Sequence, residues 1–319
     1  MRDAGCTHVV MEVSSHSLVL DRVAGIHFAV GVFTNLTQDH LDFHKTMDAY
    51  RDAKAILFTM CDIGVINYDD EAGRVILKNA PCKTLTYSAK EDAADLVAKS
   101  IKLKAAGVDF AAVAKGEIAR VSLGIPGEFS VYNALSAIGC CLALDIHLEA
   151  SAQALQTAHG VKGRAEVVPT PTDYTVLIDY AHSPDALENM LPSIKENTEG
   201  RLICLFGCGG DRDRTKRPLM AKAAAKYADH LIITSDNPRN EDPDAIIDEI
   251  ITGLDGSTTP YERITDRRAA IFHAVKIAKK GDVIVLAGKG HEDYQVLKDN
   301  VHIHFDEREI CAEPLKALS

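Results

Sequence analysis

Tryptophan is absent from this 319-residue sequence, aromatic residues make up only 6% of it, and basic residues are outnumbered by acidic ones. The 46 Asp and Glu against 35 Lys and Arg give a formal net charge of -11. Such a chain has no basic face that would attract a polyanion nonspecifically, so we expect no nucleic-acid partner. A phosphorylated ligand would have to bind through a local cluster of cations, backbone N–H groups or metal ions.

Long apolar runs are missing as well. No run approaches the roughly 20 residues that a membrane-spanning helix needs, and the start MRDAGCTHVVMEV lacks a signal-peptide pattern. None of the eight cysteines forms a CxxC pair, and most lie in apolar runs, where a reduced cysteine behaves as a small hydrophobe. We therefore expect a cytoplasmic monomer with reduced thiols and no membrane partner.

A phosphate-binding P-loop of the pattern GxxxxGKS or GxxxxGKT is also absent. The chain begins almost directly with an apolar run, residues 7–13, whose composition is typical of a buried strand. A buried strand this close to the terminus predicts that earlier elements of the same sheet are missing. We therefore expect a chain that is truncated at its N-terminus.

Short apolar runs alternate with amphipathic stretches along the whole chain, which predicts an α/β fold. In the first half, we expect strands at residues 8–13, 28–34 and 64–68, helices at 47–60, 70–78 and 132–144, and an antiparallel excursion at 84–126. In the second half, we expect strands at 175–179, 202–206, 230–234 and 282–287, and helices at 184–197, 218–227, 243–254 and 267–279.

A cluster of Gly, Pro and Thr near residues 160–171 marks the expected boundary between two domains, residues 1–162 and 163–319. The second domain has the layout of a doubly wound, mostly parallel sheet. Such a sheet binds its ligands at the carboxyl ends of its strands. The polar residues that follow each expected strand are therefore the candidates for a functional site.

Two polar clusters of this kind occur in the first half. Glu12 lies within an apolar strand and is followed by Ser14; a buried carboxylate is costly unless it is paired or bound to a metal. The alternative is a Glu that hydrogen-bonds to a neighbouring helix. The loop 34–42 contains Asn35, Asp39 and His40, donors that suit Mg²⁺ or Mn²⁺, although a turn and a helix cap would use the same residues.

Lys54, on the expected helix 47–60, is predicted to be solvated.

The second half contains three further clusters. The loop 207–217 is rich in Gly and in cations, which suits a phosphate or a carboxylate. The loops 236–239 and 288–293 both follow strands and are expected at the same edge of the sheet. There Arg239 can pair with a carboxylate, while Asp236 and Glu292 can accept from an ammonium group. Together they predict a site for a zwitterion such as an amino acid; the alternative is an ordinary strand-end turn with surface salt bridges.

These segments, in this order, resemble the Mur ligase family. The motifs that carry the resemblance are MEVSSHSL, FTNLTQDHLDFH, YRDAKAILF, GRAEVV, DYAHSPDALE, FGCGGDRDRTKRPLM, DNPRNE and GKGHEDYQ. The resemblance implies a central ATPase-like domain, here truncated and without its P-loop, followed by a Rossmann-like, doubly wound C-terminal domain. It also implies an ATP-dependent ligase of peptidoglycan precursor synthesis. ATP would phosphorylate the D-glutamate carboxylate of UDP-MurNAc-L-Ala-D-Glu, and the amine of meso-diaminopimelate would attack the acyl phosphate.

The same resemblance implies roles for individual residues. The expected Mg²⁺ ligands are Glu12, His40 and Lys54, the last as a carbamate formed with CO₂. The UDP-muramoyl peptide is expected to contact Ser14 and Arg22, although Leu20 replaces a frequent Gln nearby. The residues expected to line the ATP site are Asn133, Arg164, Asp179 and His182. The residues expected to bind the amino acid are Arg212, Asp236, Asn237, Pro238, Arg239, Gly288 and Glu292.

The DNPR form of the second-last motif resembles that of the diaminopimelate-adding members rather than the lysine-adding ones, because Arg239 can pair with the second carboxylate that lysine lacks. Family members carry a UDP-binding domain and a P-loop before the segment that begins here. We therefore expect that this chain alone does not turn over, and ADP release by the purified chain would contradict that expectation. Two alternatives stay open: a ligase similar to folylpolyglutamate synthetase, and a truncated protein that only binds ligand.

Overall fold

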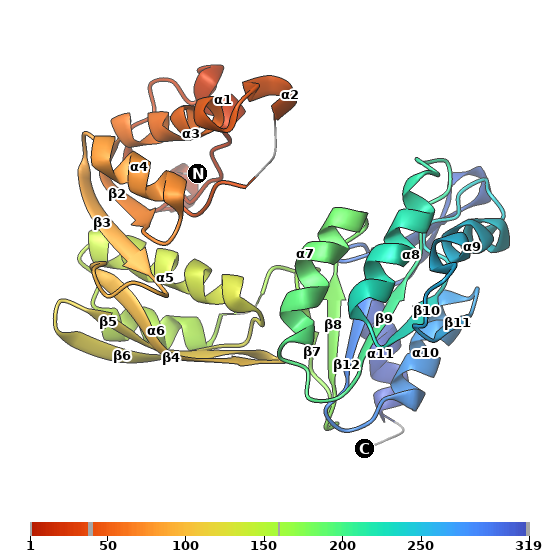
Figure 1. The fold of residues 1–319 in the computed structure, drawn as a ribbon. Helices are drawn as coiled ribbons and strands as arrows, with labels where there is room; N and C mark the ends of the chain where they lie inside the picture. The colour runs from red at the N-terminus through yellow and green to blue at the C-terminus, as the bar shows by residue number, and fades with distance from the viewer. Residues whose placement is uncertain (1, 38–40, 159, 317–319) are drawn as a thin grey trace. The chain divides into compact units, whose positions relative to one another are not determined.

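The computed structural model describes residues 2–37, 41–158 and 160–316 (Figure 1). The chain divides into two compact units. Unit 1 comprises residues 1–101, 109–121 and 131–156, and unit 2 comprises residues 102–108, 122–130 and 157–319. Two six-stranded sheets with helices on their faces form the cores, which confirms the predicted α/β class. The predicted domain boundary after residue 162 stays a prediction.

The first sheet has the strand order β1-β2-β3-β4-β5-β6. Neighbouring strands from β1 to β4 pair in parallel. The predicted antiparallel excursion is therefore wrong for β3 and β4, which extend the parallel part of the sheet. The turn between β5 and β6 uses Lys115 and Gly116 at φ values of 50° and 81°, as a tight hairpin requires. The strands are β1 (Phe28–Phe33), β2 (Cys61–Asn67), β3 (Lys83–Ser88), β4 (Leu96–Lys104), β5 (Gly107–Ala114) and β6 (Glu117–Leu123).

Alternate residues of β2 pack against helices on opposite faces of this sheet. Ile66 belongs to a buried cluster with Phe58 and Ile76. Val65 lies on the other face beside Gly139, where an added Cβ would be 2.7 Å from Val65 Cγ1. The helical segments of this part of the chain are η1 (Arg2–Ala4), α1 (Ser15–Val19), α2 (Leu41–His44), α3 (Met47–Ala55), η2 (Ile56–Thr59), α4 (Glu71–Asn79), α5 (Glu128–Ala143) and α6 (Leu148–Gln156).

The second sheet, in unit 2, has the strand order β11-β10-β9-β12-β8-β7. All of its pairs are parallel except β7 with β8, as a doubly wound sheet with one antiparallel edge requires. The strands are β7 (Glu166–Val168), β8 (Thr175–Asp179), β9 (Leu202–Phe206), β10 (His230–Ile233), β11 (Tyr261–Arg263) and β12 (Val283–Ala287). A separate antiparallel hairpin consists of β13 (Tyr294–Leu297) and β14 (Val301–His304).

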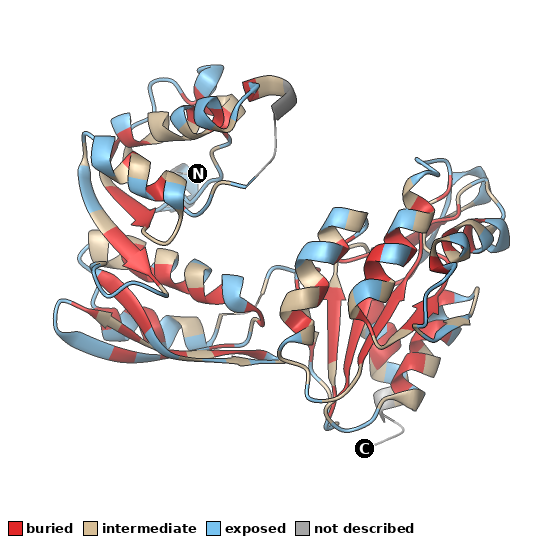
Figure 2. Ribbon diagram, in the orientation of Figure 1, coloured by how far each residue is buried: buried red, intermediate tan, exposed pale blue. Residues whose placement is uncertain are grey.

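Helices cover both faces of the second sheet, so its central strands are buried along their whole length (Figure 2). Cys204 and Phe206 of β9 pack into the cluster formed with α7, α8 and α9, whereas Ile203 and Leu205 pack into the cluster with α10 and α11. The helical segments are α7 (Pro184–Lys195), α8 (Lys216–Tyr227), α9 (Pro243–Ile251), η3 (Thr252–Leu254), α10 (Arg267–Ile277), η4 (Lys298–Asn300) and α11 (Glu307–Lys316).

Helix starts in unit 2 follow side-chain caps that are visible in the sequence. Ser183, Asp242 and Asp266 each accept a backbone hydrogen bond from the first turn of α7, α9 and α10. Pro184 and Pro243 occupy the first helical position, where a missing N–H costs nothing. The predicted strands and helices of the second half are accordingly confirmed, with small shifts at their ends. The short strands β7 and β11, the hairpin and α11 were not predicted.

The predicted strand at residues 8–13 is wrong. Residues 6–14 form no strand, and the side chains of Val9 and Val10 are 63% and 99% exposed. Among the described strands, β1 pairs only with β2, so this apolar segment has no strand beside it to complete a ladder. Glu12 is consequently exposed rather than buried. None of the helices in the described ranges has the length and apolar character that crossing a bilayer requires.

Candidate functional site

The four neighbouring strands β8, β12, β9 and β10 end at one edge of the second sheet, and the loops after them enclose a cavity of about 360 Å³. We call this cavity the strand-end pocket. The predicted meeting of loops 236–239 and 288–293 at one edge is confirmed, because both contribute to its lining. The pocket is lined by Tyr180, His182, Gly207, Cys208, Gly209, Arg212, Lys216, Asp236, Asn237, Arg239, Gly288, Glu292 and Tyr294.

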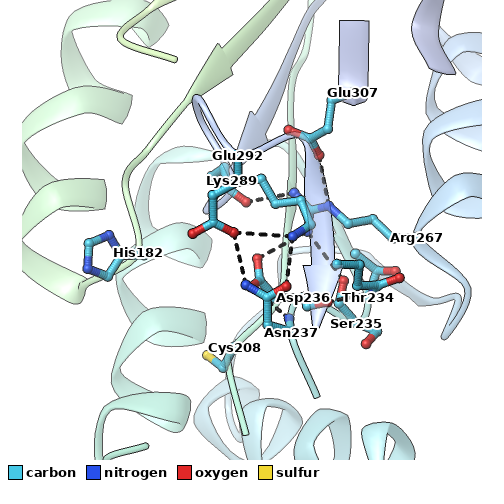
Figure 3. Close-up of polar contacts among 12 residues, drawn as sticks. His182, Cys208, Thr234, Ser235, Asp236, Asn237, Arg267, Lys289, Glu292 and Glu307 are labelled. Atoms are coloured by element: carbon cyan, nitrogen blue, oxygen red, sulfur yellow. Dashed lines mark hydrogen bonds and ion pairs between the residues drawn. The ribbon is translucent and has the colours of Figure 1, made fainter. Parts of the chain in front are cut away.

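Asn237 links the two loops (Figure 3). Its Nδ2 donates to Glu292 Oε2 at 2.9 Å, and its Oδ1 accepts from Lys289 Nζ at 3.0 Å and from Val296 N at 2.9 Å. Its own backbone N–H donates to Asp236 Oδ1 at 2.7 Å. Because both ends of the amide have fixed partners, the side chain can adopt only one orientation.

Lys289, in the loop 288–293, is fully buried. Its Nζ donates to Tyr294 O at 2.8 Å and lies 3.4 Å from Glu292 Oε2, in addition to its bond to Asn237. A buried ammonium group is tolerated only when it is paired and hydrogen-bonded. Lys289 and Asn237 therefore hold one oxygen of Glu292 at the pocket wall.

Arg267, at the start of α10, is a second fully buried cation (Figure 3). Its Nε donates to Glu307 Oε1 at 2.8 Å, its Nη2 donates to Ala287 O at 2.9 Å, and its Nη1 lies 4.0 Å from Asp236 Oδ2. Burial lowers the pKa of Arg267, but the carboxylates of Glu307 and Asp236 outweigh it and raise that pKa above its ordinary value. The guanidinium is thus a permanent positive charge behind Asp236.

Asp236 Oδ2 is buried and accepts no hydrogen bond from any described residue. Gly288, at φ 114°, leaves this oxygen uncovered, since an added Cβ there would stand 2.9 Å from it. A buried acceptor without a donor is costly unless a ligand or water supplies one. Asp236 and Glu292 therefore give the pocket an acidic wall with room for an ammonium donor.

Arg239 and Arg212 supply positive charge to the same pocket. Arg239 has a left-handed backbone with φ 51°, and its Nη1 donates to Gly210 O at 2.9 Å. Arg212 is exposed, and its Nη1 donates to Asp211 O at 3.2 Å. Pro238 is buried in the same loop but is not part of the lining.

An ordinary turn with surface salt bridges does not fit this arrangement. The side chains of Asp236 and Glu292 are only 13% and 15% exposed, and each has a fully buried cation beside it. Surface pairs are solvated on most sides and are worth little. Here two carboxylates are held at fixed positions in a cavity that basic groups also line, which is an arrangement that suits a zwitterionic ligand.

The remaining unit 2 candidates lie around Tyr180. Asp179, at the end of β8, accepts from Ala165 N at 2.7 Å and Ala181 N at 2.8 Å. The Arg164 guanidinium lies 5.6 Å from the centre of the Tyr180 ring, and the His182 ring lies 4.7 Å from it. His182 belongs to the pocket lining, whereas Arg164 and Asp179 do not.

Three of the unit 1 candidates line a separate cavity of about 650 Å³, which is bounded by residues 7–15 and by β1. Glu12, Ser14 and Lys54 contribute to its lining. Lys54 is only partly exposed, and its Nζ lies 5.3 Å from the centre of the Tyr50 ring, so the expectation of a fully solvated lysine is wrong. Ser14 caps α1 by accepting from Ser17 N at 3.2 Å.

Two of the described unit 1 candidates, Arg22 and Asn133, are not part of that lining. Arg22 and Asn133 are exposed, in a turn and on α5 respectively. His40 lies outside the described residues. Within the described ranges, no group of three His, Cys, Asp or Glu side chains is arranged to hold a metal ion. The expected Mg²⁺ site therefore stays a prediction that depends on His40 and on modification of Lys54.

Several residues of the strand-end pocket were missed by reasoning from the sequence. Tyr180 and Tyr294 line it, as does Lys216, which belongs to the predicted loop 207–217 but was given no role of its own. Their positions could have indicated a role in the site, since the motifs DYAH, RTKR and GHEDYQ each come after a predicted strand. The burial of Lys289 and Arg267 carried no signal, because a basic residue in a loop or at a helix start is usually exposed.

Comparison with known proteins places this chain in a family. Residues 1–141 match the model of the Mur ligase middle domain, and residues 163–290 match the model of the Mur ligase glutamate ligase domain. The chain belongs to the Mur ligase family.

Its similarity to particular members is high. It is 49% identical over 320 residues to the UDP-N-acetylmuramoyl-L-alanyl-D-glutamate–2,6-diaminopimelate ligase of Clostridium botulinum, covering 100% of this chain and 65% of that protein. It is 50% identical over 316 residues to the ligase of the same name from Caldanaerobacter subterraneus, covering 99% of this chain and 65% of that protein. The chain thus spans about two-thirds of the length of these curated relatives.

Solved structures agree with this assignment. One structure of a UDP-N-acetylmuramoyl-L-alanyl-D-glutamate–2,6-diaminopimelate ligase matches with a TM-score of 0.78 and 37% identity, over 99% of this chain and 66% of that one. The MurF ligase of Thermotoga maritima in complex with ADP matches with a TM-score of 0.63 over 96% of this chain and 66% of that one, but at 16% identity it shows the fold alone.

Proposed function

We propose that this chain supplies the amino-acid site and part of the catalytic centre of an ATP-dependent amide ligase. The ligase adds meso-diaminopimelate to UDP-MurNAc-L-Ala-D-Glu through an acyl phosphate, as a step in peptidoglycan precursor synthesis. The observation that carries the proposal is the strand-end pocket, in which Arg239 and Arg212 share one cavity with Asp236 and Glu292.

The charges of the pocket match those of the ligand. Diaminopimelate has two ammonium groups and two carboxylates. Asp236, whose Oδ2 accepts no hydrogen bond from the described residues, and Glu292 can accept from an ammonium group. Arg212 and Arg239 can each pair with a carboxylate through two parallel hydrogen bonds. Lysine lacks the carboxylate at the far end, so it would leave the half-buried Arg239 guanidinium without a carboxylate.

The attacking amine must be neutral, correctly oriented and close to the acyl phosphate. Groups that hold the rest of the amino acid at fixed positions contribute by reducing the entropy cost of that encounter. In this chain Asn237, Lys289 and Arg267 fix the two acidic side chains before any ligand binds. The pocket therefore orients the substrate without a large rearrangement.

ATP and Mg²⁺ complete the proposal. Mg²⁺ prefers oxygen ligands, and it would neutralise charge on the phosphates as the acyl phosphate forms and decays. Glu12 offers a carboxylate at the cavity that Lys54 also lines. CO₂ would add to the neutral amine of Lys54, which has lost its proton, to form a carbamate and release a further proton. The carbamate would be a second anionic ligand, and His40 would supply a neutral imidazole. Arg164, Asp179, His182 and Asn133 are the proposed contacts of ATP, and Ser14 and Arg22 those of the UDP-muramoyl peptide.

Replacement of Arg239 tests the proposal. Arg239→Ala removes the guanidinium that pairs with the far carboxylate, so affinity for meso-diaminopimelate should fall by about tenfold or more while affinity for L-lysine changes little. Isothermal titration calorimetry of the full chain with each amino acid measures both. Lys222→Met, an exposed cation on α8, is the matched control and should change neither value. An Arg239→Ala chain that keeps its preference would contradict the assignment.

A further inference from the structure

We propose that Gly209 determines specificity for the second carboxylate of the amino acid, because its missing side chain is what lets the Arg239 guanidinium occupy its position. This inference rests on the proposed function and goes beyond it in naming a residue that needs no contact with the ligand. Gly209 is a positioning residue, and it acts through Arg239.

The contact between the two residues is close. A Cβ added to Gly209 would stand 2.8 Å from Arg239 Nη1, which is nearer than real Cβ atoms approach a nitrogen. The other neighbours of that Cβ are at ordinary contact distance: Arg212 Cγ at 3.7 Å and Asn237 O at 3.8 Å. The guanidinium is therefore the one neighbour that must move if residue 209 carries a side chain.

The backbone conformation at residue 209 does not require a glycine. The structure's left-handed glycines include Gly288 and Gly290, but Gly209 is not among them. Gly210 is different, since a Cβ there would stand 1.9 Å from Pro238 O, so a substitution at 210 would disturb the loop itself. Residue 209 can thus be changed to Ala without backbone strain, which separates a steric effect on Arg239 from a folding defect.

Arg239 cannot relieve the contact by moving its backbone. Its N–H donates to Val296 O at 3.1 Å, and its left-handed φ of 51° is an unusual conformation held by the surrounding loop. The end of the side chain would have to shift instead, which displaces Nη1 from its 2.9 Å hydrogen bond to Gly210 O. The guanidinium would then no longer be held ready for a carboxylate.

The test is the Gly209→Ala chain, titrated calorimetrically with meso-diaminopimelate and with L-lysine. We expect affinity for meso-diaminopimelate to fall about tenfold while affinity for L-lysine is unchanged, because only the former uses Arg239. Gly124→Ala is the matched control, since a Cβ at Gly124 meets no atom within 4 Å and its φ is not left-handed. It should leave both affinities as they are in the wild type.

A double-mutant cycle shows whether Gly209 acts through Arg239. In an Arg239→Ala background, Gly209→Ala should cause no further loss of affinity for meso-diaminopimelate. An additional loss there, or equal losses for both amino acids in the single variant, would overturn the inference. If the wild-type chain does not distinguish the two amino acids, the proposed function fails instead, so the two failures are distinguishable.

Discussion

Two fully buried cations, Lys289 and Arg267, lie behind the acidic wall of the strand-end pocket. Lys289 touches Glu292 and Asn237, and Arg267 lies beside Asp236. Carboxylates at 13% and 15% exposure would be costly to keep ionised without such partners. At the scale of the residue, the buried charges of Lys289 and Arg267 therefore hold the acidic side chains in place for an ammonium group, although neither charge contacts the ligand.

Removal of the Lys289 charge tests that view. Lys289→Met keeps the length of the side chain but leaves Glu292 and Asn237 without their shared donor. We therefore expect the unfolding free energy to fall by about 3 kcal/mol, and the affinity for meso-diaminopimelate to fall as well. Urea unfolding followed by far-UV circular dichroism, together with calorimetry, measures both. The same replacement at the exposed Lys222 should stay within about 0.5 kcal/mol of wild type. A Lys289→Met chain with wild-type stability and affinity would show that the ammonium is dispensable.

How far the sequence predicted this site depends on the residue. Asp236, Asn237, Arg239 and Glu292 were predicted because they directly follow strands whose carboxyl ends meet at one edge. The position of Gly209 against Arg239 could not be predicted, because it depends on the path of two loops and on an unusual φ. Sequence patterns report which residues follow a strand, but not which side chains touch.

At the scale of the element, periodicity predicted the central strands and the helices α7 to α10 of unit 2, because the buried strands are apolar and α7, α9 and α10 begin after a capping side chain. The segment 8–13 was predicted incorrectly for a physical reason. Its apolar composition indicates a strand, but a strand also needs a neighbour for its backbone groups, and the described chain provides none beside it.

The contact between α4 and β2 gives a prediction at this scale. Gly73 lies in α4, where a Cβ would stand 2.2 Å from Asn67 O at the end of β2. Ala is the better helix former by about 1 kcal/mol, but the clash with a backbone atom forces α4 away from the sheet and should dominate. We expect Gly73→Ala to destabilise the chain by about 2 kcal/mol in urea unfolding. Lys78→Ala, later in the same helix, is the control, and a stabilised Gly73→Ala chain would contradict the close packing.

At the scale of the whole molecule, ion pairs in unit 2 set a pH dependence of stability. Asp282 is buried, and burial raises the pKa of its carboxyl group. Hydrogen bonds from the Arg201 side chain and from the Arg201 and Lys279 backbones outweigh burial, so the pKa lies below its ordinary value. Burial likewise raises the pKa of Glu166, but hydrogen bonds from the Arg308 side chain and from the Gly163 backbone N–H outweigh burial and lower the pKa below its ordinary value. Both groups are therefore harder to protonate in the folded chain than in the unfolded one.

A carboxylate whose folded pKa is depressed adds stability above its unfolded pKa and loses it as the pH falls through the folded value. The unfolding free energy should thus stay level from about pH 7 to about pH 5 and fall below about pH 4, where Asp and Glu begin to protonate in the unfolded chain. Urea unfolding at a series of pH values measures this. Asp282→Asn should make the decline shallower, and an unchanged slope would show that Asp282 does not contribute.

The whole molecule also sets the context for its chemistry. The chain spans 65% of the length of the diaminopimelate ligases it most resembles among the relatives described, so the complete reaction belongs to the proposal rather than to the structure alone. What this chain holds by itself is the strand-end pocket, all of whose lining belongs to unit 2. Amino-acid binding is therefore the part of the account that can be tested directly on this chain.

The most direct measurement is a calorimetric titration of the wild-type chain with meso-diaminopimelate and, in parallel, with L-lysine. The account predicts saturable binding of meso-diaminopimelate and binding of L-lysine that is weaker by about tenfold or more, because lysine leaves Arg239 without a carboxylate. Equal affinities for the two amino acids, or no binding of meso-diaminopimelate, would contradict it.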